Sequence, residues 1–165
     1  MSTPRDVSFY IDGSSLGNPG EAGVGIVVAS GDDTLKNISA YIGRQTNNVA
    51  EYTALVTALE EALAMKCRRV RVFTDSELLQ RQMTGVYRVK NEAIKTLHER
   101  AMRLANAFEA FAIERIPREM NKGADKLARM AVKYRDKNTS QNGPVVARQR
   151  KAREESPSST GQRSG

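Results

Sequence analysis

The sequence predicts an α/β fold in which a mixed sheet is flanked by helices. Near the N-terminus, three runs of alternating and β-branched residues, separated by turn residues, predict an antiparallel meander. The apolar residues then recur at helical spacing, and helical segments alternate with two further short apolar runs. This order, β-β-β-α-β-α-α-β-α, favours a sheet that begins antiparallel and ends parallel.

Turn residues bound the expected strands. Residues 17–20, Gly-Asn-Pro-Gly, separate the first two strands, and Asp32 and Asp33 suit the hairpin turn before the third. Pro117 stops the last strand, because proline cannot donate to a sheet. The predicted strands are residues 7–11, 23–29, 35–42, 70–74 and 111–116.

Four helices are expected from the apolar spacing. The first contains Tyr52, Leu55 and Leu59, and either Asn47 or Asn48 is suited to cap its N-terminus. The others are predicted at residues 77–83, ended by Gly85, at residues 93–108, beginning near Asn91, and at residues 124–132, with Asn121 as the candidate cap.

One globular domain is expected from 165 residues, of which 39% are hydrophobic. Residues 136–165 are rich in Ser, Gln, Gly, Arg and Lys and hold almost no large apolar side chain. We predict that they form a disordered basic and polar tail after a folded domain at residues 1–135. The 26 Lys and Arg outnumber the 19 Asp and Glu, which favours a nucleic acid partner, although the excess charge is also explained by solubility alone.

Cys67 is the only cysteine, so neither an internal disulfide nor a thiolate zinc site is available. No apolar stretch approaches the roughly 18 residues that a spanning helix needs, and the N-terminus lacks a secretory signal pattern. We therefore expect a cytoplasmic protein that does not enter a membrane. Nothing in the sequence suggests an obligate assembly, so a monomer is expected, although the oligomeric state stays open.

Two acids follow apolar strands. Asp12 comes after residues 7–11, and Asp75 comes after residues 70–74. Ligands of open α/β sheets gather at the carboxyl ends of strands, so both carboxylates are expected at one edge of the sheet. For either acid alone, a turn or capping role is the favoured explanation, and the pair is more informative than either member.

Two further acids, Glu51 and Asp125, lie near the expected starts of helices. A carboxylate there complements the helix dipole, which is a sufficient explanation for each. Whether these helix starts converge on Asp12 and Asp75 does not follow from their spacing.

Five segments of the chain resemble ribonuclease H, type 1, and occur in that family's order. They are Tyr10-Ile-Asp-Gly-Ser-Ser, Gly17-Asn-Pro-Gly, Thr46-Asn-Asn-Val-Ala-Glu51, Thr74-Asp-Ser76 and Asn121-Lys-Gly-Ala-Asp125-Lys-Leu-Ala. The resemblance covers roughly residues 7–134. It implies the ribonuclease H-like fold, a five-stranded mixed sheet with helices on both faces, and makes residues 1–135 the catalytic domain.

The resemblance also implies an activity, endonucleolytic cleavage of the RNA strand of RNA–DNA hybrids that leaves 5′-phosphate and 3′-hydroxyl ends. Asp12, Glu51, Asp75 and Asp125 would be its catalytic and metal-binding acids, with Asp12 between two ions. Mg²⁺ prefers oxygen ligands, and Mn²⁺ is a suitable substitute. Two such ions, about 3.5–4 Å apart, assist the attacking water, the phosphoryl group and the leaving oxygen.

Substrate contacts are also implied. Asn18, Asn47 and Asn48 match family positions that touch the minor groove of the hybrid, where amide groups suit the 2′-hydroxyl. The family often carries a histidine in the loop before the last acid, but this loop has none, and Arg118 or Lys122 is the candidate replacement for a phosphate contact.

Other departures resemble a compact branch of the family. The basic protrusion after the third acid is absent, which leaves Arg88 and Lys90 as modest phosphate anchors. Glu77 stands where a glutamine often contacts bases, and His98, the only histidine, falls within a predicted helix and is interpreted as structural. Cleavage of double-stranded RNA is compatible with this branch.

Two alternatives remain open from the sequence. One is a protein of the same fold that binds nucleic acid without cutting it, against which the presence of all four acids argues. The other is an exonuclease or a transposase-like core. The Asn-Asn pair before Glu51 and the Gly-Asn-Pro-Gly turn favour ribonuclease H over an exonuclease or a transposase-like core.

Overall fold

The computed structural model describes residues 6–135, so the predicted tail lies outside the described residues. The predicted order of elements is confirmed. The elements are β1 (Asp6–Ser15), β2 (Gly20–Ser30), β3 (Asp33–Gln45), α1 (Asn47–Ala64), β4 (Arg69–Thr74), α2 (Glu77–Met83), α3 (Glu92–Ala105), β5 (Ala110–Arg115), a 3₁₀ turn η1 (Arg118–Met120) and α4 (Lys122–Lys133).

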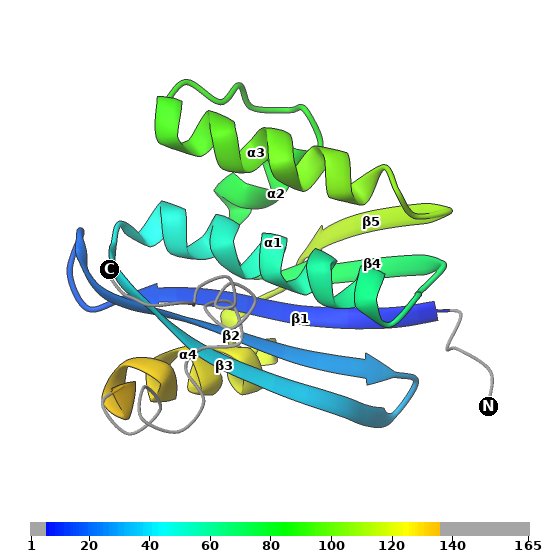
Figure 1. Ribbon diagram of the computed structural model, residues 1–165, viewed down its shortest axis with the longest axis horizontal. Coiled ribbons are helices and arrows are strands. Elements are labelled where there is room, and N and C mark those ends of the chain that lie inside the picture. Colours follow the sequence, from blue (N-terminus) through cyan, green and yellow to red (C-terminus); the bar gives the residue numbers. More distant parts are fainter. Residues whose placement is uncertain (1–5, 136–165) are drawn as a thin grey trace, which may run out of the picture.

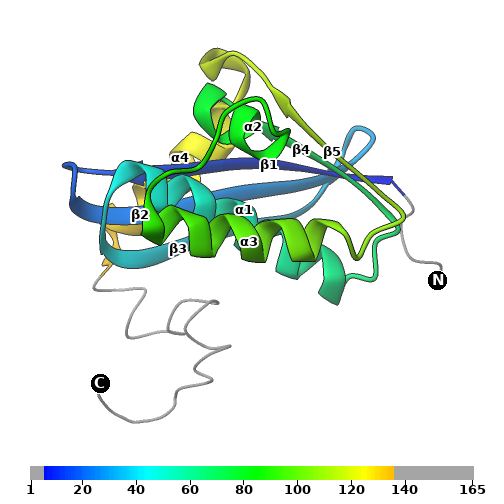
Figure 2. The same ribbon diagram turned by 90° about the horizontal axis from the view of Figure 1, so that it is seen from above.

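The five strands form one mixed sheet in the order β3-β2-β1-β4-β5. The β1–β2 and β2–β3 pairs are antiparallel, and the β1–β4 and β4–β5 pairs are parallel. Helices α1, α2 and α3 lie on one side of the sheet and α4 lies on the other (Figures 1 and 2). The predicted mixed sheet with helices on both faces is therefore confirmed.

The main core lies between the sheet and α1. Phe9 and Ile11 of β1 are buried against it, and Leu55 and Leu59 of α1 are fully buried in the same cluster. Alternation along β1 follows from the pleat, which sends every second side chain to this face. The core fixes the position of α1 over β1.

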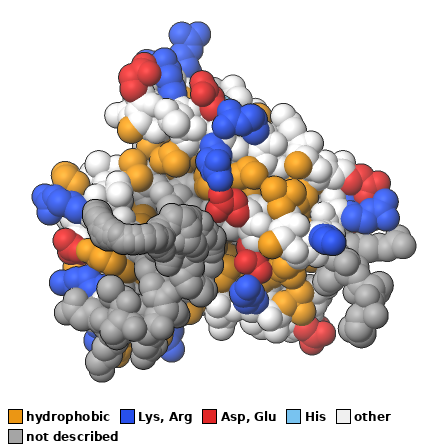
Figure 3. Space-filling view, in the orientation of Figure 1, with side chains coloured by type: hydrophobic (Ala, Val, Ile, Leu, Met, Phe, Trp, Pro, Cys, Tyr) orange, Lys and Arg blue, Asp and Glu red, His pale blue; other side chains and the backbone are white. Residues whose placement is uncertain are grey.

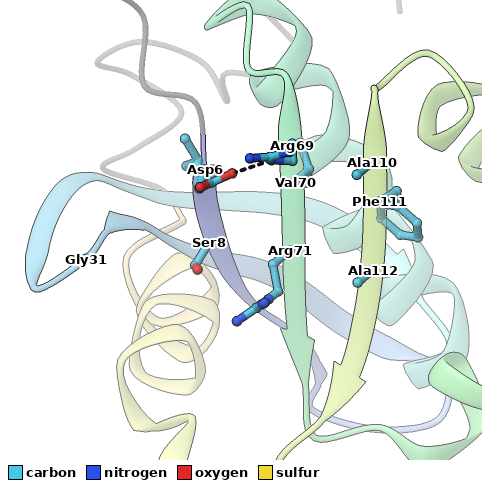
Figure 4. A pocket seen from close by; sticks show the side chains of 10 residues that line it. Asp6, Ser8, Gly31, Arg69, Val70, Arg71, Ala110, Phe111 and Ala112 are labelled. Atoms are coloured by element: carbon cyan, nitrogen blue, oxygen red, sulfur yellow. Dashed lines mark hydrogen bonds and ion pairs between the residues drawn. The ribbon is translucent and has the colours of Figure 1, made fainter.

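The opposite face is only partly covered, because α4 packs against β1, β2 and β3. Beyond α4, an open pocket of about 530 Å³ lies over the start of β1, β4 and β5 (Figure 4). Arg69 there forms an ion pair with Asp6 at 2.9 Å, and Ala110 and Ala112 of β5 also line the pocket.

Several predicted boundaries differ from the structure. The first three strands are longer than expected because their antiparallel pairing continues into polar residues, and β1 runs three residues beyond Asp12. Thr46, not Asn47 or Asn48, caps α1, with its Oγ1 accepting from the amide of Val49 at 3.2 Å. The 3₁₀ turn was not predicted.

No helix within residues 6–135 combines the length and the apolar character that crossing a membrane requires.

Candidate active site

Asp12 and Asp75 meet because β1 and β4 are parallel neighbours. Tyr10 pairs with Phe73 in the sheet, and their rings stack with centroids 4.8 Å apart. Two residues further along each strand, the same register places Asp12 beside Asp75. The prediction that Asp12 ends its strand is wrong, since β1 continues to Ser15 against β2, but its pairing with β4 ends before Asp12.

The turn after β4 holds Asp75 at the edge of the sheet. The amide of Ser76 donates to Oγ1 of the buried Thr74 at 3.0 Å, and Oγ of Ser76 caps α2 by accepting from the amide of Leu79 at 3.1 Å. Asp75 lies between these two bonded residues, so its backbone has little freedom to move away from Asp12.

Glu51 reaches the site from α1 through a close contact with β1. A side chain at Gly13 would lie 2.2 Å from the carbonyl carbon of Ala50, so only glycine allows the helix to approach so closely. The amide of Gly13 donates to Oε1 of Glu51 at 3.2 Å. The sequence places Glu51 in the first turn of the helix, whereas it is the fifth residue of α1.

Asp125 comes from α4, on the other face of the sheet. Gly25 of β2 pairs with Asp12, and a Cβ on Gly25 would lie 2.1 Å from the carbonyl oxygen of Ala124. The missing side chain at Gly25 therefore lets the first turn of α4 come down onto the sheet next to Asp12.

Asn121 fastens the start of α4 to β1. As predicted, Asn121 occupies the N-cap position of α4, but its side chain makes no cap bond there. Instead, its Nδ2 donates to the carbonyl oxygen of Ile11 at 2.8 Å. Its own carbonyl accepts from the amide of Asp125 at 3.1 Å. Asn121 is 1% exposed, so it joins the residue before Asp12 to the helix that carries Asp125.

The acids form a group that suits a divalent ion. Ligand oxygens of Asp12, Glu51 and Asp75 lie within 4.8 Å of one another. Asp125 lies outside this group, but it is close enough to Asp12 to raise the pKa of that carboxyl. A set of carboxylates without thiolate or imidazole fits hard ions such as Mg²⁺ or Mn²⁺.

Burial and mutual repulsion favour the protonated forms of two of these acids. Burial, followed by the charge of Asp75 and the contact with Asp125, raises the pKa of Asp12 to about 8. Burial, followed by the charges of Asp12 and Asp75, also raises the pKa of Glu51 well above its ordinary value. The guanidinium of Arg118 opposes both shifts. Bound divalent ions would supply the missing positive charge.

These shifts predict the pH dependence of stability without metal. The unfolded chain loses the Asp12 proton near pH 3.8, whereas the folded protein retains it to about pH 8. Rising pH therefore favours the unfolded state, and the free energy of unfolding should fall between these values and level off above them. Urea unfolding at several pH values with a chelator measures this. A rise in stability over the same interval would contradict it, and excess Mg²⁺ should flatten the fall.

The asparagines expected to contact substrate lie at the edge of the site. Asn18 is exposed, and its Oδ1 accepts from the amide of Asn47 at 3.0 Å. Asn47 is the first residue of α1 and is exposed, and Asn48 is half-buried beside it. The contact joins the β1–β2 loop to the helix that carries Glu51, and it leaves the Nδ2 donors of Asn18 for another partner.

The basic candidates divide into two groups. Arg118 is close enough to the acids to lower the pKa of Asp12 and Glu51, and Lys122 is exposed at the start of α4. Arg88 and Lys90 lie elsewhere, between α2 and α3, where they line an open pocket of about 500 Å³. On the face in Figure 3, Lys and Arg are scattered among acidic and hydrophobic side chains outside the grey atoms.

His98 and Glu77 both have partners within the helical layer. Nε2 of His98 lies 3.2 Å from the carbonyl oxygen of Gln82. The imidazole ring of His98 and the ring of Tyr52 pack in a T-shaped arrangement, with centroids 6.2 Å apart. This contact between α1, α2 and α3 agrees with the structural role predicted for His98. Glu77 pairs with Arg81 at 2.8 Å on the surface of α2.

Sequence reasoning missed Gly25, Arg129 and the side-chain role of Asn121. Isolated glycine within an apolar strand signals a close backbone approach, and this signal was available at Gly25. Oδ2 of Asp125 lies 2.7 Å from Nη2 of Arg129, and their spacing of four residues permits that pair on a helix. Nothing in the sequence indicates that Asn121 bonds β1, because its partner is 110 residues away.

Comparisons with known proteins agree on one family. A family model described as reverse transcriptase-like matches residues 10–131. The bifunctional protein Rv2228c of Mycobacterium tuberculosis is 40% identical over 128 residues, which make up 76% of this chain, and the chain spans 35% of the length of that protein.

Two solved structures are similar over nearly their whole length. RNase H1 from Halobacterium salinarum has a TM-score of 0.76 at 39% identity, covering 78% of this chain and 98% of that one. LC11-RNase H1, solved in complex with an RNA/DNA hybrid, has a TM-score of 0.73 at 41% identity, covering 77% of this chain and 96% of that one.

Proposed function

The chain belongs to the ribonuclease H family, and from this premise we propose that it is an endonuclease that hydrolyses the RNA strand of RNA–DNA hybrids. The observation that carries the proposal is that ligand oxygens of Asp12, Glu51 and Asp75 lie within 4.8 Å of one another, with Asp125 close enough to raise the pKa of Asp12. The similar LC11-RNase H1 was solved with an RNA/DNA hybrid bound, which supports this substrate. The expected products carry 5′-phosphate and 3′-hydroxyl ends.

The four acids would hold two Mg²⁺ ions, and Mn²⁺ would substitute for them. When bound, such ions supply Lewis acidity for the attacking water, the phosphoryl oxygens and the leaving 3′-oxygen. The protein keeps the acids in place through the Gly13 amide, which holds Glu51, and through Asn121, which holds α4. Carboxylates fixed in this way need little rearrangement when the ions bind.

Amide and basic groups would hold the hybrid. The side-chain amide of Asn18, together with Asn47 and Asn48, suits the 2′-hydroxyls that distinguish RNA from DNA. Arg118 and Lys122 suit a phosphate next to the acids. Arg88 and Lys90 suit phosphates further along the duplex.

A cleavage assay with three substrates tests the function. The full chain is incubated with a labelled RNA–DNA hybrid, double-stranded RNA and double-stranded DNA, each with Mg²⁺ or Mn²⁺, beside an Asp75→Asn variant. We expect the parent to cut the RNA of the hybrid and the variant to cut it at least about a hundredfold more slowly. Hybrid binding without cleavage would favour the non-cutting alternative, and cleavage of double-stranded RNA would show relaxed specificity. Unimpaired cleavage by the variant would show that the site is misassigned.

Arg118→Ala should weaken hybrid binding and reduce its dependence on salt. A residue that neutralises one phosphate contributes about one unit to the slope of log affinity against log salt concentration. Titrations of binding between about 50 and 200 mM salt measure this slope. Arg103→Ala is the matched control, since Arg103 is an exposed arginine near the end of α3. Equal slopes for the two variants would contradict a phosphate contact by Arg118.

The cytoplasmic location and the monomeric state expected for this protein from its sequence stay predictions.

A further inference from the structure

Asp125 differs from the other three acids in having a cationic partner. Among residues 6–135, it is the only one of the four in a salt bridge, with Oδ2 2.7 Å from Nη2 of Arg129. The two residues lie one turn apart on α4, with the acid nearer the N-terminus, which is the favourable order for such a pair.

The carboxyl group of Asp125 therefore lies between two sets of partners. On one side it is close enough to Asp12 to raise the pKa of that carboxyl. On the other side it is bound by Arg129, and it stays outside the group of three acids whose ligand oxygens are within 4.8 Å of one another. Its position agrees with a carboxylate that is held back from the centre of the site.

Arg129 is able to release Asp125 without disturbing the core. Its side chain is 66% exposed, whereas that of Asp125 is 29% exposed, and Arg129 makes no other ion pair among the described residues. The buried residues of α4 are on its other face, at Ala124, Ala128, Ala131 and Val132. Movement of the guanidinium into solvent would leave that packing intact.

We propose that Arg129 is a positioning residue that competes with a divalent cation for the carboxylate of Asp125, and so weakens the binding of that cation. This inference rests on the proposed function, because it takes Asp125 as a metal ligand. A carboxylate oxygen that accepts from a guanidinium has fewer lone pairs available, so the cation must displace Arg129 or share the oxygen with it. The cost of that displacement lowers the affinity of the site.

Calorimetric titration of the full chain with Mn²⁺, without nucleic acid, tests the proposal. An Arg129→Ala variant should bind Mn²⁺ about two- to fivefold more tightly than the parent, the range that the strength of a partly exposed ion pair allows. Lys126→Ala is the matched control, because it removes the same charge from an exposed neighbour of Asp125 that makes no ion pair among the described residues. Its effect should be clearly smaller.

A second comparison separates competition from general electrostatics. In an Asp125→Asn background, where the ion pair no longer exists, Arg129→Ala should leave Mn²⁺ affinity unchanged relative to Asp125→Asn alone. Equal tightening by Arg129→Ala and Lys126→Ala, or tightening that persists in the Asp125→Asn background, would overturn the proposal while leaving the proposed function intact. Failure of the parent itself to bind Mn²⁺ would overturn the metal site and this inference together.

Discussion

An Asp12→Asn variant is expected to cleave RNA–DNA hybrids at least about a thousandfold more slowly than the parent, and to be more stable than the parent without metal. Ligand oxygens of Asp12 lie within 4.8 Å of those of Glu51 and Asp75, and Asp75 and Asp125 both raise the pKa of Asp12. In the proposed two-metal site, loss of this carboxylate would remove a shared ligand of the ions, whose contribution to the transition state is several kcal/mol.

The gain in stability follows from the same environment. Asp12 is buried beside other carboxylates, which raises its pKa to about 8. Above that pH the folded protein carries a charge that costs on the order of several kcal/mol compared with the unfolded chain. Asparagine has no charge to bury, so the variant should melt at a higher temperature in chelator at alkaline pH.

Asp32→Asn is the matched control for this prediction. It makes the same chemical change in the exposed turn between β2 and β3, and neither cleavage nor melting should change appreciably. An Asp12→Asn protein that cuts as fast as its parent, or that melts at a lower temperature in chelator, would contradict the placement of Asp12 at the centre of the acids.

A Gly25→Ala variant is expected to lose both stability and activity although Gly25 has no reacting group. The added Cβ would lie 2.1 Å from the carbonyl oxygen of Ala124 and 2.5 Å from the amide nitrogen of Ala128. Both are backbone atoms of α4, so the whole helix must move away from the sheet. Overpacking of this kind costs about 1–3 kcal/mol.

The rate of hybrid cleavage should fall as well. Gly25 pairs with Asp12, and α4 carries Asp125, so displacement of the helix separates two of the acids. A displacement of about 1 Å at a catalytic group reduces the rate on the order of a hundredfold. Urea unfolding and hybrid cleavage at saturating substrate measure the two effects.

Gly123→Ala provides the comparison within α4 itself. A Cβ there would meet only Cγ2 of Val27 at 3.2 Å, a side-chain atom that is able to shift, and alanine favours the helix over glycine. This variant should retain activity and be about as stable as the parent or more so. If Gly25→Ala behaved like Gly123→Ala, α4 would not depend on close contact with β2.

The local patterns of the sequence determined the elements and their order. Alternation and helical periodicity act through neighbouring residues, so strands, helices and the turn at residues 17–20 were predictable. The positions of Asp12 and Asp75 directly after apolar runs were enough to make them candidate site residues, because the carboxyl ends of parallel strands share an edge of the sheet. The resemblance to ribonuclease H was needed to identify Glu51 and Asp125 as site residues, because acids are common near the starts of helices.

Only the tertiary structure decided how the four acids meet. Gly13 brings α1 to β1, Gly25 brings α4 to β2, and Asn121 bonds to Ile11 across 110 residues. Such contacts depend on backbone packing between distant segments, which local patterns do not encode. The same reason explains why the partner of Asp125 was missed: spacing permits a pair with Arg129, but only the folded structure shows that Arg129 holds a carboxylate next to Asp12.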